Sequence, residues 1–141
     1  MAKIQRATFT VYHSYVNGEP FSIGFNVGFI PHTVIVRQIE YGNCTLDTNL
    51  SAIQTDLVNF GDGIIGYVFP NSIAVPPDEV NTPIAMTVTG NAEFMVNPSK
   101  VTSGVMSFQI LSPSDPGGTL ERNSFADGNL LILLEFVRYP E

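Results

Sequence analysis

The chain has 141 residues, a length that fits one domain and is too short for two well-packed domains. Charged residues make up only 13% of the sequence, hydrophobic residues make up 44%, and the formal net charge is −7. Its six lysine and arginine residues are scattered, so the sequence predicts neither nucleic-acid binding nor attraction to an anionic membrane surface. The single cysteine excludes an internal disulfide framework and a multi-cysteine metal site.

The low share of charged residues bears on how the surface is covered. The share of charged residues is about half of that in an ordinary soluble domain, and the mean hydropathy is positive, at +0.17. A subunit that packs permanently against other copies needs fewer charged side chains than a soluble monomer does. We therefore expect a homo-oligomer, and the alternative is a monomer whose surface is covered by neutral polar residues.

The N-terminal residues lead directly into a strand pattern and lack the apolar core of a signal peptide. The longest apolar run, Leu130 to Leu134, is far shorter than a membrane-spanning helix. We therefore expect synthesis in the cytoplasm and no membrane partner. Triplets at Asn43 and Asn49 lie at or near the glycosylation pattern, and the sequence leaves their modification open.

The first third of the chain alternates between apolar and polar residues, which is the period of a half-buried strand. Strands are predicted over Ala7 to Val16 and over Phe21 to Phe29. Asn17-Gly18 between them favours a tight turn, so we expect these two strands to form a hairpin. The next strand, Thr33 to Tyr41, contains the run Val34-Ile35-Val36, which suits burial on both faces and predicts a central strand.

The middle of the chain has weaker signals. Leu46 to Asn59 has apolar spacings of three and four, and we expect a loop followed by a strand, with one helical turn as the alternative. Phe60-Gly61-Asp62-Gly63 predicts a turn, and Ile64 to Phe69 predicts a short strand after it. Pro70 to Pro83 holds four prolines, which exclude regular pairing and predict a surface crossing.

The last third returns to alternation. Ile84 to Thr89 and Glu93 to Val96 are predicted as strands separated by a turn at Gly90-Asn91. Val105 to Leu111 is a further strand. Asn129 to Tyr139 is apolar on both faces, so we expect it to lie in the middle of its sheet or to be covered by a partner subunit.

These seven to nine strands predict an all-β fold, an antiparallel β-sandwich spanning residues 1–141 as a single domain. Its expected specific form is a single jelly roll. The residues expected to be mainly buried are Phe25, Val27, Val36, Ile39, Phe108, Ile132, Leu134 and Phe136.

Reactive chemistry is sparse, and we expect no enzyme, no cofactor, no metal site and no catalytic residue. His13 falls on the inward face of its strand and is expected to be a core or rim residue, while His32 is expected in a loop. No Gly-x-Ser-x-Gly elbow is present, and Cys44 has no neighbouring cation or histidine in the sequence to lower its pKa. Solvated loop charge is favoured over calcium binding for the acidic residues Asp47, Asp56, Asp62, Asp78, Glu79, Asp115 and Asp127.

Two segments carry a resemblance to a known family. They are the stretch from Phe29 to Tyr41 (FIPHTVIVRQIEY), with the Gly-rich turn and Pro-rich crossing that follow, and the closing stretch from Leu133 to Tyr139 (LLEFVRY). In this order they resemble small single jelly-roll capsid proteins of double-stranded DNA viruses, including virophages and giant-virus relatives. The resemblance implies a minor capsid, vertex or cement protein, because a major capsid subunit of these viruses is usually longer and holds two jelly rolls.

We therefore expect a non-enzymatic structural protein of a virion, synthesised in the host cytoplasm. Its expected partners are copies of itself, as a trimer or pentamer, and other capsid proteins. The alternative is a carbohydrate- or ligand-binding β-sandwich, lectin-like or C1q-like, in which loop aspartates or Tyr12, Tyr41 and Tyr67 line a site.

Overall fold

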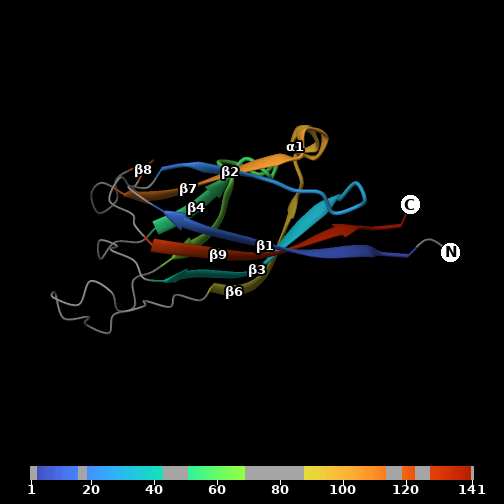
Figure 1. Cartoon of the computed structure of the whole chain (residues 1–141), viewed down its shortest axis with the longest axis horizontal. Helices are drawn as coiled ribbons and strands as arrows, with labels where there is room; N and C mark the ends of the chain where they lie inside the picture. The colour runs from blue at the N-terminus through green and yellow to red at the C-terminus, as the bar shows by residue number, and fades with distance from the viewer. Residues whose placement is uncertain are drawn as a thin grey trace.

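Two antiparallel sheets packed face to face form the molecule (Figure 1). A computed structural model describes residues 3–15, 19–42, 51–68, 88–113, 119–122 and 128–140. In spatial order, the first sheet contains β1 (Gln5–Tyr15), β9 (Gly128–Arg138), β3 (Thr33–Gly42) and β6 (Val88–Met95). The second sheet contains β2 (Phe21–Gly24), β7 (Val105–Pro113), β4 (Ser51–Thr55) and β5 (Ile64–Val68), and β8 (Leu120–Arg122) also pairs with β7. The predicted all-β sandwich is confirmed.

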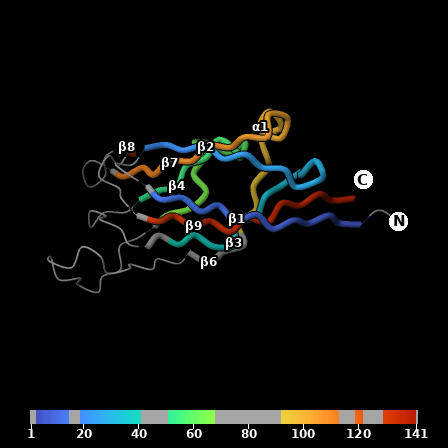
Figure 2. Tube along the Cα trace, in the orientation of Figure 1, coloured from blue at the N-terminus to red at the C-terminus, as the bar shows by residue number. Residues whose placement is uncertain are grey.

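The strand pairs are nested along the chain. β1 pairs with β9, β2 with β7, β3 with β6 and β4 with β5, and each pair is antiparallel. The chain is thus arranged as one long two-stranded ribbon that winds around the core. Ladders between β3 and β9 and between β4 and β7 join neighbouring turns of the ribbon. Figure 2 shows the result, with both chain ends emerging at the same end of the sandwich.

The predicted hairpin between the first two strands is wrong. β1 lies in the first sheet and β2 in the second, so the connection between them joins the two sheets. β1 instead pairs with β9 over its whole length, a more extensive ladder than the four-residue β2 could offer. The rings of His13 and Phe21 stack between the sheets with centroids 3.9 Å apart, so the inward faces predicted for both strands do meet across the core.

The second strand ends earlier than predicted, but its burial pattern continues. β2 stops at Gly24, while Phe25, Val27 and Phe29 continue to pack against the core with every second side chain half-buried. The backbone N–H of Phe25 donates to the carbonyl of Gly104 at 2.9 Å, which keeps this extension beside β7. Alternation therefore predicted the buried face correctly but not the length of the ladder.

The predicted turn at Gly90-Asn91 is also wrong, because both residues lie inside β6. The register between β3 and β6 shifts here, since Val36 lies opposite Ala92 while Gln38 lies opposite Thr89. Two residues of β6 thus face one residue of β3, which is a bulge. A turn-forming pair serves equally well at a bulge, where regular pairing is interrupted.

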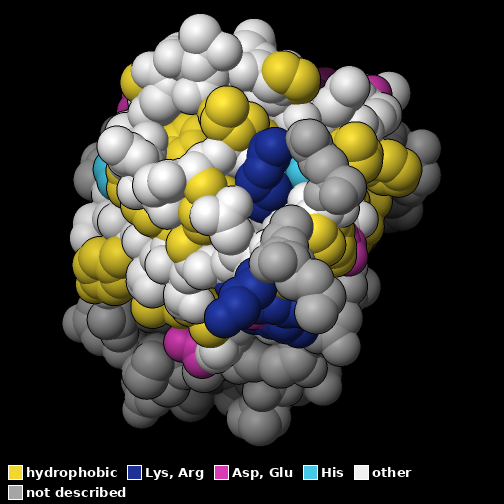
Figure 3. Space-filling view, turned by 90° about the vertical axis from the view of Figure 1, so that its right-hand side faces the viewer, with side chains coloured by type: hydrophobic (Ala, Val, Ile, Leu, Met, Phe, Trp, Pro, Cys, Tyr) yellow, Lys and Arg dark blue, Asp and Glu magenta, His cyan; other side chains and the backbone are white. Residues whose placement is uncertain are grey.

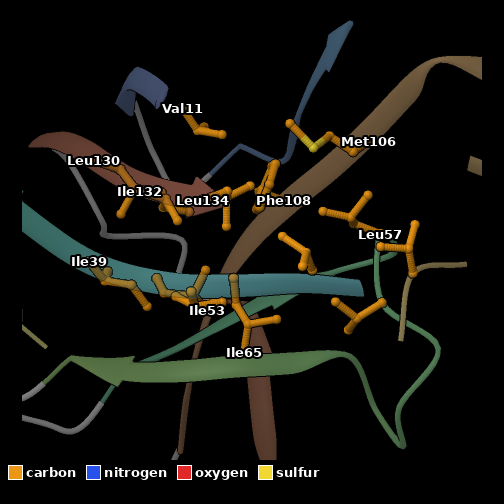
Figure 4. Packing of buried hydrophobic residues seen from close by; sticks show 14 of the residues in the cluster. Val11, Ile39, Ile53, Leu57, Ile65, Met106, Phe108, Leu130, Ile132 and Leu134 are labelled. Atoms are coloured by element: carbon orange, nitrogen blue, oxygen red, sulfur yellow. The ribbon is translucent and has the colours of Figure 1, made fainter. Parts of the chain in front are cut away.

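The central position predicted for β3 is confirmed, and of the two alternatives left open for β9, a central strand or a strand covered by a partner subunit, the structure shows the central strand. β3 lies between β9 and β6, and its Val34, Ile35 and Val36 are buried on both faces. β9 lies between β1 and β3, which accounts for its apolar character. Figure 4 shows the core, in which side chains from both sheets interleave. Of the residues expected inside, Phe25 and Val27 are half-buried at its edge, and the buried ones are Val36, Ile39, Phe108, Ile132, Leu134 and Phe136.

A short helix that the strand pattern did not predict, α1 (Pro98–Ser103), connects β6 to β7. Asn97 caps it, with its side-chain oxygen accepting the N–H of Ser99 at 3.3 Å. The helix places Lys100 beside the end of β4, where its ammonium group lies 3.0 Å from the carboxylate of Asp56.

Candidate functional site

A hollow of about 350 Å³ lies against the second sheet, at the end of β4 and beside the turn that leads to β5. Met106, Phe108 and Ile110 belong to the core cluster, so alternation turns Ser107 and Gln109 to the outer face of β7. The hollow is lined by Pro20, Gln54, Thr55, Asp56, Asp62, Ser107, Phe108 and Gln109.

Two glutamine side chains form part of its lining. Gln54 of β4 and Gln109 of β7 lie directly opposite each other in the antiparallel ladder. The Gln109 Nε2 donates to the Gln54 Oε1, and the Gln54 Nε2 donates to the backbone carbonyl of Asp62 at 2.7 Å. Both amides are therefore oriented before any ligand arrives, which lowers the entropy lost on binding.

The two aspartates of the hollow are held differently. Asp56 is engaged twice, since its Oδ1 accepts the backbone N–H of Ser107 at 2.8 Å and its Oδ2 pairs with Lys100. The exposed carboxylate of Asp62 makes no ion pair with any residue that the structure describes. The unbalanced negative charge at Asp62 disfavours an anion and suits hydroxyl or amine groups, to which amide and carboxylate oxygens act as acceptors.

On the outer face of the first sheet, a carboxylate lies between two arginines. The Nε and Nη2 of Arg37 donate to the Oε2 of Glu135 at 3.2 and 3.1 Å, and Arg6 donates to its Oε1. The hydrogen bond from Arg6, followed by that from Arg37, holds the pKa of Glu135 below its ordinary value. These charges lie on three neighbouring strands and tie β1, β9 and β3 together.

A second carboxylate on this face is held by two hydroxyl groups. Glu93 accepts hydrogen bonds from Thr33 and from the phenol of Tyr139. Both hydrogen bonds lower the pKa of Glu93. The bond between Tyr139 and Glu93 also raises the pKa of the Tyr139 phenol. The carboxylates of Glu93 and Glu135 thus stabilise the fold, because each is held by hydrogen bonds from side chains of the protein itself.

Apolar side chains are also present on the surface. Leu131 and Leu133 of β9 lie on the outer face of the first sheet and are only partly covered, opposite Tyr12 and Thr10 of β1. At the end that carries the termini, Figure 3 shows hydrophobic side chains among lysine and arginine side chains. Large hydrophobic side chains are 65% exposed at Ile30, 62% at Phe60 and 61% at Met95.

The two histidines do not come together. His13 pairs with Leu130 near the start of β9, whereas His32 lies beside its end, where its N–H donates to the carbonyl of Val137 at 2.8 Å. Burial lowers the pKa of His13. The Nδ1 of His32 accepts the backbone N–H of Tyr139 at 3.3 Å. His13 therefore lies against the core and His32 in a loop, as the sequence predicted.

Of the residues proposed for the binding alternative, Asp56 and Asp62 converge on the hollow, while Tyr12 and Tyr67 lie on different sheets and do not line it. Gln54, Gln109 and Lys100 were not anticipated, because no local pattern marks them. The candidates that fall outside the described residues are Cys44, Asp47, Asp78, Glu79, Asp115, Asp127 and the side chain of Tyr41, together with Asn43 and Asn49.

Within the described ranges, no group of three or more His, Cys, Asp and Glu side chains is placed to hold a metal ion. The same part of the chain contains no helix with the length and apolarity needed to cross a membrane. Comparison with protein-family models gives no match for this chain, and comparison with curated proteins gives none either.

Proposed function

We propose that this chain is a non-enzymatic structural subunit of a virion, in a minor capsid, vertex or cement position. It is synthesised in the host cytoplasm and acts through contacts with copies of itself and with other capsid proteins, without binding nucleic acid or membrane. The observation that carries the proposal is the nested pairing of β1 with β9, β2 with β7, β3 with β6 and β4 with β5.

That nesting supports a jelly roll as the specific form of the sandwich. A jelly roll has eight strands in two sheets built from Greek keys. With β8 left aside, the described residues supply eight strands, four in each sheet, and the ribbon they form crosses from one sheet to the other. Small capsid proteins of the family that the sequence resembles use this fold for assembly.

The surface supports a role in assembly. Glu135, Glu93 and Asp56 are engaged in holding the sandwich together. The outer face of β9 presents Leu131 and Leu133, which a neighbouring subunit would cover. We propose that this contact joins different patches of two copies with a rotation that closes, which gives a ring, either a trimer or a pentamer.

The experiment is size-exclusion chromatography with light scattering on the full chain. We expect an oligomer for the wild type and loss of the trimeric or pentameric ring for Leu131→Glu and Leu133→Glu, because each variant places a charge in the apolar contact. Thr102→Glu, at an exposed position of α1, is the matched control and should leave the oligomer intact. A wild-type monomer that no capsid protein recruits would refute the proposal.

The hollow favours a second candidate function, a lectin-like or C1q-like module that binds a carbohydrate or another small ligand. Its amides are oriented, and Asp62 adds a carboxylate that suits hydroxyl groups. A glycan array tests this candidate directly. A specific hit that is lost in both Gln109→Ala and Asp62→Ala would displace the structural role in favour of binding.

A further inference from the structure

β1 is an unusually regular edge strand. Within the described residues it pairs only with β9, and that ladder runs from Gln5 to Tyr15 without a register shift. Proline, glycine and bulges keep an exposed edge from pairing with another chain, and β1 contains none of them.

The other edge strands show such protection. β2 and β8 are short, with four and three residues. β5 contains Gly66 and has a register shift against β4, and β6 carries the bulge at Gly90-Asn91. β1 is therefore the edge best suited to accept another strand by backbone hydrogen bonding.

The hydrogen bonds of β9 show which groups of β1 point outward. The carbonyl of Val137 accepts the N–H of His32, so the polar backbone groups of Val137 point toward β3 and those of Phe136 point toward β1. Phe136 lies opposite Ala7, so the odd-numbered residues of β1 bond to β9. The N–H and C=O groups directed away from the sheet are those of Arg6, Thr8, Thr10, Tyr12 and Ser14.

We propose that this edge pairs with β1 of a second copy, antiparallel and centred on Thr10, so that the two first sheets become continuous across a two-fold axis. Thr10 then meets Thr10 of the other copy, Thr8 meets Tyr12, and Arg6 meets Ser14. Every outward N–H of the strand finds a carbonyl in this register.

The charges of the strand favour this occupant and this direction. Between Gln5 and Tyr15, Arg6 is the one charged side chain at neutral pH, apart from any protonated His13, and no acidic residue is present. A parallel copy in register would place the two arginines side by side, whereas the antiparallel arrangement places them at opposite ends of the shared ladder. Residues 8, 10 and 12 are neutral and exposed, and a pair of threonines across two strands is favourable.

The contact is isologous and joins two copies, whereas the proposed ring contact at Leu131 and Leu133 joins different patches. It follows from the edge itself and does not depend on a role in a virion. The two contacts can therefore fail separately in an experiment.

A charge-reversal experiment at the axis tests the proposal by sedimentation velocity. Thr10→Lys and Thr10→Glu each place two like charges against each other, so each variant alone should lose the two-fold association. Mixing equal amounts should restore it, because Lys then meets Glu across the axis. Thr10→Gln is the neutral control and should associate as the wild type does.

Association of either charged variant alone at wild-type strength overturns the proposal, as does a mixture that stays dissociated. If Leu133→Glu breaks the oligomer while the variants at Thr10 do not, the ring contact stands and the edge contact is refuted. If the wild type is monomeric at every concentration, both contacts are refuted.

Amide hydrogen exchange supplies a second readout that also reports on folding. In the associated wild type, the amides of Thr8 and Tyr12 should be protected from exchange, and so should those of Phe9 and Val11. Thr10→Pro removes one outward N–H from each copy and should weaken association roughly thirtyfold. In this variant Phe9 and Val11 should keep their protection from β9 while Thr8 and Tyr12 lose theirs. Fast exchange at Thr8 and Tyr12 in the wild-type oligomer would overturn the proposal.

Discussion

Phe25 stacks on Phe136 with ring centroids 5.4 Å apart and ring planes inclined by 8°, although Phe25 follows a strand of the second sheet and Phe136 belongs to the first. Phe25 follows β2, whereas Phe136 lies in the middle of the first sheet and also meets the ring of Phe9 edge-on at 6.3 Å. Phe136 is fully buried and Phe25 is only half-buried. The stack therefore joins the two sheets at a point where β2 has already stopped pairing.

Truncating the inner ring of this stack should be costly. Phe136→Ala should lower the free energy of unfolding by about 3–5 kcal/mol, because it leaves a cavity in a packed core. Phe25→Ala should cost less, since part of that ring already contacts water, and Phe136→Leu should also be milder. Urea unfolding followed by circular dichroism measures all three. A larger loss for Phe25→Ala than for Phe136→Ala would contradict the arrangement.

The turn between β4 and β5 depends on one glycine. Gly63 has φ of +77°, and a Cβ at this position would lie 2.3 Å from the backbone carbonyl oxygen of Thr55. Gly61, in the same turn, has φ of +46° and open space around it. Gly61→Ala should therefore show only the backbone strain of about 1 kcal/mol, while Gly63→Ala should cost clearly more because the end of β4 must move.

Thermal unfolding of the two glycine variants measures the difference. Since Thr55 and Asp62 both line the hollow, Gly63→Ala should also disturb any binding there, whereas Gly61→Ala should not. Equal losses of stability in the two variants would show that the close approach to Thr55 is unimportant.

How much the sequence could predict depended on whether a signal was local. Alternation identified Phe108 of β7 as buried, and the apolar run Val34-Ile35-Val36 identified β3 as a central strand. The apolar faces of β9 fitted a central strand and a strand covered by a partner equally well. The order of strand pairing is not local, so Asn17-Gly18 suggested a hairpin that the nested ribbon does not contain. The helix after β6 has local signals of its own, namely Asn97 as its cap, Pro98 in its first turn and Gly104 after its end, although the alternation on either side of it predicts only strands.

The candidate site shows the same limit. Gln54 and Gln109 are 55 residues apart in the sequence and become neighbours only because β4 pairs with β7. Two glutamines have no spacing rule that would predict a shared site. Asp56 and Asp62 were identified as loop aspartates, but the difference between them depends on Lys100 of an unpredicted helix.

The free energy of unfolding should fall in acid, because the carboxylate of Glu135, which lies between Arg6 and Arg37, becomes protonated. The pKa of Glu135 in the folded protein lies below its ordinary value of 4.5, so the unfolded chain binds this proton more readily. The stability that Glu135 contributes is therefore complete above pH 4.5 and is lost as the pH falls through the lower folded value. Glu93 acts in the same direction, since its pKa is also lowered.

Urea unfolding from neutral pH down to about 3 measures this effect. Glu135→Gln should lower stability at neutral pH and make the loss on acidification shallower than in the wild type. Arg6→Gln should also make it shallower, because the bond from Arg6 is the largest cause of the shift. An acid response in Glu135→Gln as steep as that of the wild type would assign the response to other groups.

The two partners of Asp56 should contribute unequally to stability. Its Oδ1 accepts the partly buried N–H of Ser107, whereas its Oδ2 meets the partly exposed ammonium group of Lys100. Lys100→Met should cost no more than about 0.5 kcal/mol, since exposed ion pairs contribute little. Asp56→Ala should cost about 1–3 kcal/mol, because it leaves the N–H of Ser107 without its acceptor. Asp56→Asn, which keeps an oxygen for that N–H, should resemble Lys100→Met. Chemical denaturation of the three variants measures these differences in stability. If Asp56→Asn loses as much stability as Asp56→Ala, the charge of Asp56, rather than its hydrogen bond to β7, stabilises this end of the second sheet.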